Sequence, residues 1–483
     1  MGAERREDVG PTSGSDLAIE WRGLRPVPAS SRFGRPRELI PFWFALQLFP
    51  VAFFIGAVGA EGFIGLALWQ GVLAIVIGSA LGAAIVAGLS VMGARTGAAQ
   101  IPLARAPFGK SVTLVGVLAY GINIVYLALA AVYGAQALQV LIGGIPFTVA
   151  LLIMFAVEAA ISVVGYELVH RYEHLTALLA GLGFLAIGIA LLTKANEIHV
   201  PQTVHGAALT GSFILMTVIS FSFSFSWTVN SSDYCRYLPE NTSAPRLIWS
   251  VFAGVAIGCV VMEVMGLAAA NILVHHVSQM RSLFDLLSGG ALGYAVMLAI
   301  CIGVIANLTA TNYSAALEIL STGLRVSRPV MTGISAALGF AVTVWLHGGN
   351  LLTKAENLIL VATYWVGPFV AIVAIHWWQS SIRTHVDAVN TPLERLPSGW
   401  NALAALILGF VVCLPFSNTT EGATLAAHGG ILKTLFGSVS TEIHGADLAY
   451  PVGILVAGIT YALLTYRLRS AAATAETAQV RGA

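Results

Sequence analysis

The stretch Ser220-Phe-Ser-Phe-Ser-Phe-Ser-Trp-Thr-Val-Asn-Ser-Ser-Asp-Tyr-Cys-Arg-Tyr-Leu-Pro239 decides the fold class, because an apolar segment that could cross a bilayer turns midway into hydroxyl and amide residues. Backbone groups in hydrocarbon have no water to pair with, so such an interruption is tolerated only where protein or a solvated cavity surrounds it. The pattern therefore predicts a binding cavity inside a membrane protein, beside Trp227.

Composition also places the chain among membrane proteins. Hydrophobic residues make up 57% of its 483 residues and charged residues only 10%, and the mean hydropathy is +0.83. Soluble domains of ordinary composition are less apolar. The formal net charge is +1, whereas nucleic-acid binding needs a strongly basic surface. We therefore expect small molecules and membrane lipid as partners, and no nucleic acid.

The sequence lacks the motifs of common enzymes and metal proteins. Its four cysteines are far apart and form no C-x-x-C pair, so neither a disulfide framework nor a zinc site is predicted. No H-E-x-x-H, G-x-S-x-G, P-loop or dinucleotide-binding glycine motif occurs. We expect no enzyme activity, no metal site and no cofactor.

Apolar segments follow one another along most of the chain. A span needs about 20 apolar residues, and by this measure the sequence holds about twelve, with short polar joints. We expect an all-α polytopic membrane protein with one transmembrane domain at residues 38–469, between disordered cytoplasmic tails at 1–37 and 470–483. The segments are 40–62, 65–92, 112–142, 146–168, 174–193, 207–229, 246–273, 290–316, 329–347, 351–378, 400–418 and 448–467.

Lys and Arg residues separate between alternate joints. Ten lie in one set of joints and four in the other. Positively charged joints stay on the cytoplasmic side, so we expect an integral protein of the cell (inner) membrane with both termini cytoplasmic. The larger set is Arg95, Arg105, Lys110, Arg171, Arg236, Arg246, Arg325, Arg328, Arg383 and Arg395, and the smaller is Lys194, Arg281, Lys354 and Lys433.

Two apolar segments are interrupted at mid-depth. The first contains Pro50 and the glycines up to Gly59, and the sixth is interrupted from Phe225 to Val229, five spans later. A pair of interrupted spans in corresponding halves indicates an inverted-repeat transporter, with substrate held between the broken helices. By contrast, Gly78 and Gly82 are expected only to allow close helix packing.

The interrupted sixth segment combines a flat aromatic ring with hydrogen-bonding groups. Trp227 follows Phe225 and Ser226 and precedes Asn230. Stacking holds a planar ring of any identity, and neighbouring donors and acceptors then choose among rings by leaving the polar atoms of a wrong ring unpaired. An interfacial anchor is the alternative role of a tryptophan in a membrane protein.

Three other segments add candidates. Polar side chains recur along one face of the third and the eighth segment, and Phe53 lies in the interrupted first segment. A polar stripe in lipid faces the bundle interior, where it lines a substrate or ion path or hydrogen-bonds a neighbouring helix. The substrate-binding candidates are Trp227, Ser226, Phe225, Asn307, Phe53, Tyr126, Asn123 and Thr311.

Two carboxyl groups fall well inside apolar segments. Glu158 lies in the fourth and Glu263 in the seventh. A charged carboxylate is costly in hydrocarbon, so such a group can take up and release a proton during transport. The alternative is a carboxyl that pairs with an amide and ties two helices together.

Five ordered motifs resemble the nucleobase–cation symporter family, specifically its purine-cytosine permease branch. The likeness runs from about Arg35 to Arg395, and Trp227 with Ser232-Asp-Tyr-Cys-Arg-Tyr-Leu-Pro239 is similar to the branch signature W-A-P-Y-A-S-D-Y-x-R-Y-L-P. The other motifs are Gly93-Ala-Arg-Thr-Gly-Ala-Ala-Gln100 with Arg105-Ala-Pro-Phe-Gly109, Gly165-Tyr166 with His170-Arg-Tyr-Glu173, and Asn307 with Tyr313-Ser-Ala-Ala-Leu317.

The resemblance implies a leucine-transporter-like fold of two inverted five-helix repeats plus two C-terminal helices, working by alternating access. It also implies uptake of a nucleobase or related ring that stacks on Trp227 and hydrogen-bonds to Asn307. Sodium or a proton would drive uptake.

The chain departs from its relatives where they are polar. Its first span reads Gln47-Leu-Phe-Pro-Val-Ala-Phe-Phe-Ile-Gly56, Tyr126 stands where relatives have Trp, and Ala130 where they have an amide. The hydroxyls that coordinate sodium in sodium-dependent members fall here on Cys301 and Ile302. Ile302 cannot ligate a hard cation, which requires oxygen, so a proton is the expected coupling ion and sodium is less favoured.

The leading hypothesis is a proton-coupled importer of a nucleobase, cytosine or a purine, or of a related planar heterocycle. The alternatives are a sodium-coupled permease for a hydantoin, allantoin or thiamine-type substrate, and an uncoupled channel or sensor, because lost ion ligands could mean lost coupling.

Overall fold

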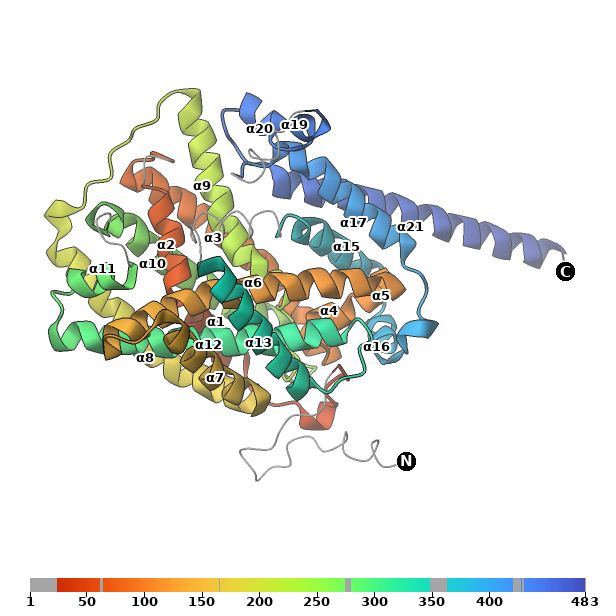
Figure 1. The fold of residues 1–483 in the computed structure, drawn as a ribbon. Helices are drawn as coiled ribbons and strands as arrows, with labels where there is room; N and C mark the ends of the chain where they lie inside the picture. The colour runs from red at the N-terminus through yellow and green to blue at the C-terminus, as the bar shows by residue number, and fades with distance from the viewer. Residues whose placement is uncertain are drawn as a thin grey trace.

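A computed structural model describes residues 24–60, 64–164, 166–273, 279–347, 363–419, 427 and 430–482. Over these residues the chain is helical and contains no strand. Its main helices lie in a bundle, and three helices near the C-terminus lie together at one side of it (Figure 1). The main helices are α1 Leu39–Gln47, α2 Pro50–Val58, α3 Leu68–Thr96, α6 Val112–Ile142, α7 Phe147–Val164, α8 Tyr166–Thr193, α9 Ala207–Phe225, α10 Ala244–Leu273, α12 Gly290–Leu320, α13 Arg328–His347, α15 Val366–Gln379, α17 Trp400–Cys413 and α21 Ala449–Gly482.

Short helices complete the described chain. They are η1 Ala29–Ser31, η2 Pro36–Glu38, α4 Gln100–Leu103, α5 Arg105–Phe108, η3 Gly109–Ser111, η4 Ala195–Glu197, η5 Ser226–Val229, α11 Gln279–Leu286, α16 Ile382–Asn390, η6 Leu393–Arg395, η7 Leu414–Phe416, α19 Ile431–Leu435 and α20 Ser438–Glu442.

The apolar segments of the sequence correspond to these main helices, confirming the all-α polytopic prediction. Six helical stretches are long and apolar enough to cross a membrane, a bent pair makes a seventh, and several shorter apolar helices accompany them. Leucines on the outside of the bundle, such as Leu152, Leu185 and Leu298, are more than half exposed. Such side chains are stable only in contact with lipid or another protein. The first half of the predicted span 351–378 lies outside the described residues.

The first span is broken between α1 and α2, which are bent by 63° relative to each other. Pro50 is the first residue of α2 and has no N–H to donate to α1. The residue before a proline is pushed into extended conformation, and Phe49 has φ −143° and ψ 158°. The proline therefore ends one half of the span and begins the other.

Glycines set the distance between the helices that carry the two breaks. A Cβ atom on Gly266 of α10 would overlap the Phe53 carbonyl of α2, and one on Gly56 of α2 would overlap the Glu263 backbone of α10. Gly78 and Gly82 of α3 likewise leave no room for a side chain against α9. This geometry supports the expectation that Gly78 and Gly82 allow close packing of two helices.

The structure describes parts of both expected tails. Residues 24–37 lie against the bundle: the Val27 N–H donates to the Gly97 carbonyl and the Phe33 N–H to the Tyr237 carbonyl. Polar bonds from the tail thus find free carbonyls at helix ends. The α21 backbone is helical to Gly482, because its Ala-rich sequence has high helix propensity. Residues 1–23 and 483 lie outside the described residues.

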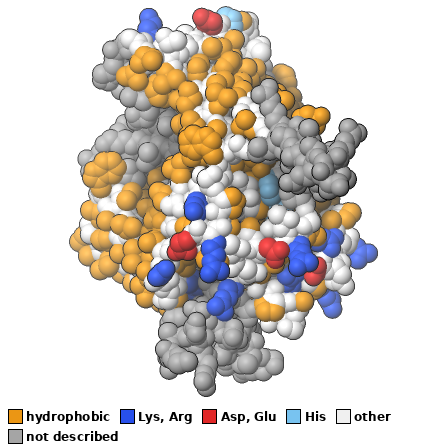
Figure 2. Space-filling view, turned by 90° about the vertical axis from the view of Figure 1, so that its right-hand side faces the viewer, with side chains coloured by type: hydrophobic (Ala, Val, Ile, Leu, Met, Phe, Trp, Pro, Cys, Tyr) orange, Lys and Arg blue, Asp and Glu red, His pale blue; other side chains and the backbone are white. Residues whose placement is uncertain are grey.

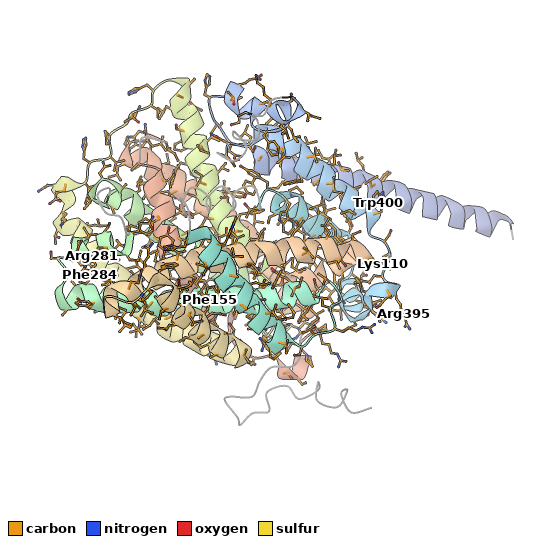
Figure 3. All side chains as sticks on the ribbon, viewed as in Figure 1. Lys110, Phe155, Arg281, Phe284, Arg395 and Trp400 are labelled. Atoms are coloured by element: carbon orange, nitrogen blue, oxygen red, sulfur yellow. The ribbon has the colours of Figure 1, made fainter. Side chains whose placement is uncertain are left out.

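Charges gather at the ends of the bundle. Figure 3 places Lys110 and Arg395, from the larger set of Lys and Arg residues, at the end opposite Arg281 and Phe284. Figure 2 shows Lys and Arg side chains, with Asp and Glu among them, on the face that bears the former end, between hydrophobic areas. The alternation of Lys and Arg between successive joints of the sequence predicts this separation of Lys110 and Arg395 from Arg281.

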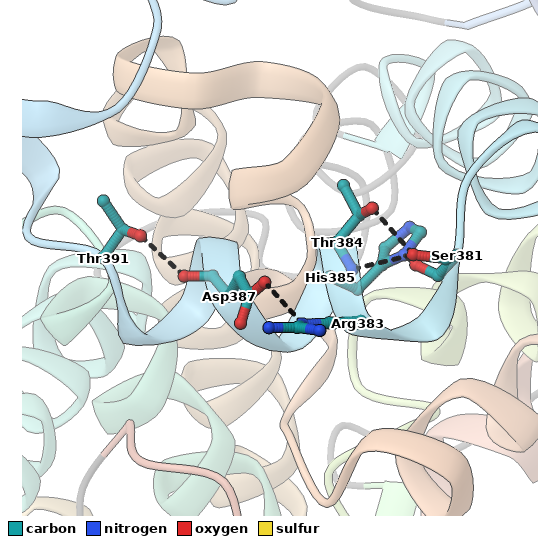
Figure 4. Close-up of polar contacts among 6 residues, drawn as sticks. All are labelled: Ser381, Arg383, Thr384, His385, Asp387 and Thr391. Atoms are coloured by element: carbon teal, nitrogen blue, oxygen red, sulfur yellow. Dashed lines mark hydrogen bonds and ion pairs between the residues drawn. The ribbon is translucent and has the colours of Figure 1, made fainter.

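The short helix α16 lies at that charged end. The Ser381 hydroxyl caps it by accepting a hydrogen bond from the Thr384 N–H at 3.2 Å (Figure 4). Arg383 and Asp387 form an ion pair of 3.6 Å along the exposed surface. His385 points the other way and is buried, so α16 lies on the bundle with one face in water.

We predict that Gly266→Ala lowers the thermal unfolding midpoint of the detergent-purified protein. The new methyl group meets backbone rather than a flexible side chain, so α2 and α10 must separate, which costs about 1–3 kcal/mol or more. The matched control is Gly88→Ala on α3, where a Cβ meets no atom within 4 Å and helix propensity rises. Its midpoint should be unchanged or higher, and equal losses in both variants would contradict the packing role.

Candidate functional site

The sixth span loses its helical form near the middle of the protein. α9 ends at Phe225, η5 continues to Val229, and turns follow to Tyr237. Hydroxyls along α9 bond to backbone carbonyls of the preceding turn: Ser222 to Ile219 at 2.8 Å and Ser226 to Phe223 at 2.8 Å. Such local bonds compete with the helix ladder and bend it, so the serine-rich sequence produces the break.

A cavity lies beside this break. It is bounded by the start of α2, by α6, by the end of α9 with η5, and by α12. The lining residues are Phe49, Ile122, Asn123, Tyr126, Phe223, Ser226, Trp227, Val229, Asn230, Asn307 and Thr311. The cavity thus joins both broken spans to α6 and α12.

The aromatic part of the lining is held by other rings. Trp227 is 8% exposed and packs edge-on against Trp43 of α1, with ring centroids 5.8 Å apart and planes at 85°. Phe49 and Phe223 face each other across the two breaks at 5.9 Å. Such edge-on pairs fix the orientation of the Trp227 ring, which lines the cavity where a planar ligand could stack on it.

The polar part of the lining consists mainly of amides. Asn307 Nδ2 donates to the Leu46 carbonyl, a group released by the break in the first span, at 3.1 Å. Asn123 Nδ2 and Asn230 Nδ2 both donate to the carboxyl of Glu318 on α12, at 2.6 and 3.3 Å. Each amide is therefore fixed by a protein acceptor while it lines the cavity.

Six of the eight predicted substrate-binding residues line this cavity: Trp227, Ser226, Asn307, Tyr126, Asn123 and Thr311. Phe225 and Phe53 do not. Phe225 turns to the other side of α9 and packs on Phe221 and Tyr450, with centroids at 4.7 and 5.6 Å. Phe53 is fully buried against α10. Neighbours in a helix point in different directions, so adjacency to Trp227 did not bring Phe225 into the cavity.

The two predicted proton-coupling carboxyls lie outside the cavity lining, in different environments. Glu158 Oε1 accepts hydrogen bonds from Asn312 at 2.6 Å and Ser162 at 3.0 Å. Glu263 is fully buried, and neither of its oxygens has a partner of full hydrogen-bond geometry. The Ser220 hydroxyl of α9 is the polar side chain beside it.

A dense cluster of buried polar residues follows the break in the sixth span. Asp233 Oδ1 accepts a hydrogen bond from the Gln100 N–H at 2.8 Å, and the Gln100 side chain accepts bonds from Ser231 and Ser232. Burial raises the pKa of Asp233 to about 6 against these bonds and the charge of Arg236. The loop before α6 and the turns after η5 are therefore locked to each other.

Several residues of the site were not predicted. Phe49, Ile122, Phe223 and Val229 are apolar lining residues that no polar pattern could reveal. Glu318 stands near the inner end of an apolar span, where a charged residue usually marks a boundary, yet it is 1% exposed. Its spacing from Asn307 and Thr311, which places it near the same helix face, was the available signal.

The side chains at the two positions expected to coordinate sodium offer no oxygen. The Cys301 thiol contacts the Gly134 carbonyl at 3.7 Å, and α12 offers Ile302 beside it. Within the described ranges, no group of three or more His, Cys, Asp or Glu residues could hold a metal ion.

Known proteins resemble the chain over most of its length. The family model described as permease for cytosine/purines, uracil, thiamine, allantoin matches residues 26–453. The putative purine-cytosine permease YxlA of Bacillus subtilis is 23% identical over 467 residues, covering 93% of this chain and 96% of that protein. A purine-cytosine permease of Saccharomyces cerevisiae is 25% identical over 482 residues, covering 93% of this chain and 86% of that protein.

Solved structures show the same fold. Mhp1, a nucleobase-cation-symport-1 family transporter, in a closed conformation with bromovinylhydantoin bound, has a TM-score of 0.70 at 17% identity, covering 91% of this chain and 93% of that chain. The inward-facing conformation of Mhp1 has a TM-score of 0.67, also at 17% identity, covering 92% and 94%. These likenesses establish the fold that the sequence resemblance implied.

Proposed function

The chain belongs to the family of permeases for cytosine/purines, uracil, thiamine and allantoin, and on this premise we propose that it imports a nucleobase, cytosine or a purine, or a related planar heterocycle, together with a proton. The family and the fold make it a secondary transporter that works by alternating access. We also propose that both termini are cytoplasmic, which the separation of Lys and Arg between the two ends supports.

The observation that carries the substrate class is the cavity between the broken spans. It combines the Trp227 ring with the amides of Asn123, Asn230 and Asn307. An aromatic face suits a flat ring, and amides hydrogen-bond the ring's polar edge. Apolar walls such as Phe49 and Phe223 keep water away from those bonds, which makes a mismatched ring costly.

Two observations support a proton rather than sodium as the coupling ion. The positions expected to coordinate sodium hold Cys301, whose thiol faces a carbonyl, and Ile302, and neither offers the oxygen that a hard cation needs. In contrast, Glu263 and Glu158 are buried carboxyls inside spans. Glu263 is favoured, because both of its oxygens lack a full hydrogen bond and an unpaired charge there is costly.

The first test is thermal stabilisation of the detergent-purified protein by a panel of nucleobases, hydantoins, allantoin and thiamine, each with and without sodium. A ligand that binds only the folded state raises the unfolding midpoint. At 100 times its Kd it adds about 2.7 kcal/mol to the free energy of unfolding. We expect a shift with cytosine or a purine that sodium does not change. A midpoint shift that requires sodium would make sodium, not a proton, the coupling ion. A shift with a hydantoin or thiamine alone would make that ligand, not a nucleobase, the substrate.

Trp227→Ala should weaken binding of the preferred ring about 5- to 150-fold, because stacking of a base on an aromatic side chain is worth about 1–3 kcal/mol. Competition binding measures this. The control is Phe225→Leu at the end of α9, on the side away from the cavity. It should lower the free energy of unfolding by about 1 kcal/mol and leave ring affinity unchanged. Equal affinity in Trp227→Ala and the parent would remove Trp227 from the site.

Glu263→Gln should abolish accumulation of the ring driven by a proton gradient in proteoliposomes, while ring exchange without a gradient continues. Glutamine keeps the size of the side chain but cannot take up a proton. Glu158→Gln serves as the parallel variant, and we expect it to retain the gradient dependence because its bonds to Asn312 and Ser162 give it a helix-tying role. If Glu263→Gln kept its dependence on the proton gradient and Glu158→Gln lost it, Glu158 would be the coupling residue and Glu263 the structural one.

A further inference from the structure

Glu318 lies directly behind the part of the cavity wall formed by Asn123 and Asn230. Its side chain is 1% exposed and does not line the cavity. Its Oε2 accepts a hydrogen bond from Asn123 at 2.6 Å, and its Oε1 accepts one from Asn230 at 3.3 Å. One carboxyl on α12 thus holds two cavity amides, one from α6 and one from the break in the sixth span.

This arrangement fixes which atoms of the amides face the cavity. Both oxygens of the Glu318 carboxyl accept a hydrogen bond, one from each amide, so each amide turns its NH₂ group toward the carboxyl. Because Asn123 and Asn230 line the cavity and Glu318 does not, the carbonyl oxygen is the polar atom that each amide has left for a ligand. Asn230 has a further acceptor behind it in Asp233, which supports the same orientation. Asn307 also donates its nitrogen to a protein acceptor, the Leu46 carbonyl.

The charges around Glu318 are few. Asp233 and Tyr120 are the titratable side chains that act on it from neighbouring elements. The buried Arg105 donates to the Ser321 carbonyl at 3.0 Å, one turn beyond Glu318. The side-chain hydrogen bonds that the Glu318 carboxyl accepts from Asn123 and Asn230 both come from neutral amide donors.

We propose that Glu318 determines the ring specificity of the cavity: it holds Asn123 and Asn230 with their carbonyl oxygens facing the ligand, so that the preferred ligand is a planar ring whose edge carries N–H donors. The inference deepens the proposed function and rests on it. A ring with only acceptors on that edge leaves two buried carbonyl oxygens unpaired, and a site built to bond a donor rejects an analogue that lacks it.

The test compares ring pairs that differ by one donor. Adenine is compared with unsubstituted purine, and cytosine with 2-hydroxypyrimidine, by competition binding to the full-length protein in detergent. We expect the parent to prefer the amino-bearing ring of at least one pair by tenfold or more. Glu318→Gln should reduce that preference about tenfold, because one carboxyl oxygen becomes an NH₂ group and one of the two amides must reverse to avoid facing donor with donor.

Two further variants separate specificity from a merely structural role. Glu318→Asp remains an acceptor and should retain the preference, even if the protein is less stable. Asp447→Asn makes the same chemical change in a buried carboxyl that accepts from the Tyr364 hydroxyl and the Asn418 N–H, away from the cavity. It should leave the preference unchanged. Should Glu318→Gln not fold, Asn230→Ala removes one cavity acceptor directly and should reduce the preference in the same direction.

The outcomes are distinct. Loss of the preference in Glu318→Gln, with retention in Glu318→Asp and Asp447→Asn, supports the inference. Ring binding with an unchanged preference in Glu318→Gln, or in Asn230→Ala if it is used instead, overturns it and leaves the proposed function standing. A parent that prefers the ring without the donor also overturns it. A parent that binds no ring overturns the proposed function and this inference together.

Discussion

The two helix breaks impose the constraint on which the rest of the structure depends, because every backbone group that a break releases inside a membrane must find a partner in the protein. α12 is that partner for the first break and is tied by side-chain bonds to the second. Asn307 bonds the Leu46 carbonyl, and Gly303 lets the helix approach the Leu48 carbonyl. After the second break, the Tyr234 hydroxyl reaches the Ala310 carbonyl at 3.1 Å. The cavity lies where α12 meets both breaks.

The sequence was informative wherever a pattern had a direct physical cause. Apolar length predicted the spans, and Pro50 and the serine run before Trp227 predicted the breaks. Charge alternation separated Lys110 and Arg395 from Arg281, which lie at opposite ends of the bundle. Composition could not reveal that Val27 and Phe33 donate to the carbonyls of Gly97 and Tyr237, because those bonds depend on how distant segments pack.

Within the site, the sequence could predict which residues are polar in lipid but not which helix each one faces. Phe225 and Trp227 are two residues apart, yet one packs on Tyr450 and the other lines the cavity. Glu158 and Glu263 look alike in sequence, and only the structure gives Glu158 an amide partner and leaves Glu263 without one of full geometry. Glu318 was missed for the same reason: its importance comes from Asn123 and Asn230, which are distant in the chain.

The N-terminal segment has a consequence for movements within the protein. Val27 is bonded to Gly97 at the end of α3, Phe33 to Tyr237 after the sixth span, and Arg32 to the Ala94 carbonyl at 3.0 Å. Any movement that parts Gly97 from Tyr237 must break bonds to this segment or carry it along. Residues outside every span therefore act as a tie between the end of α3 and the turns after the sixth span, although none of them lines the cavity.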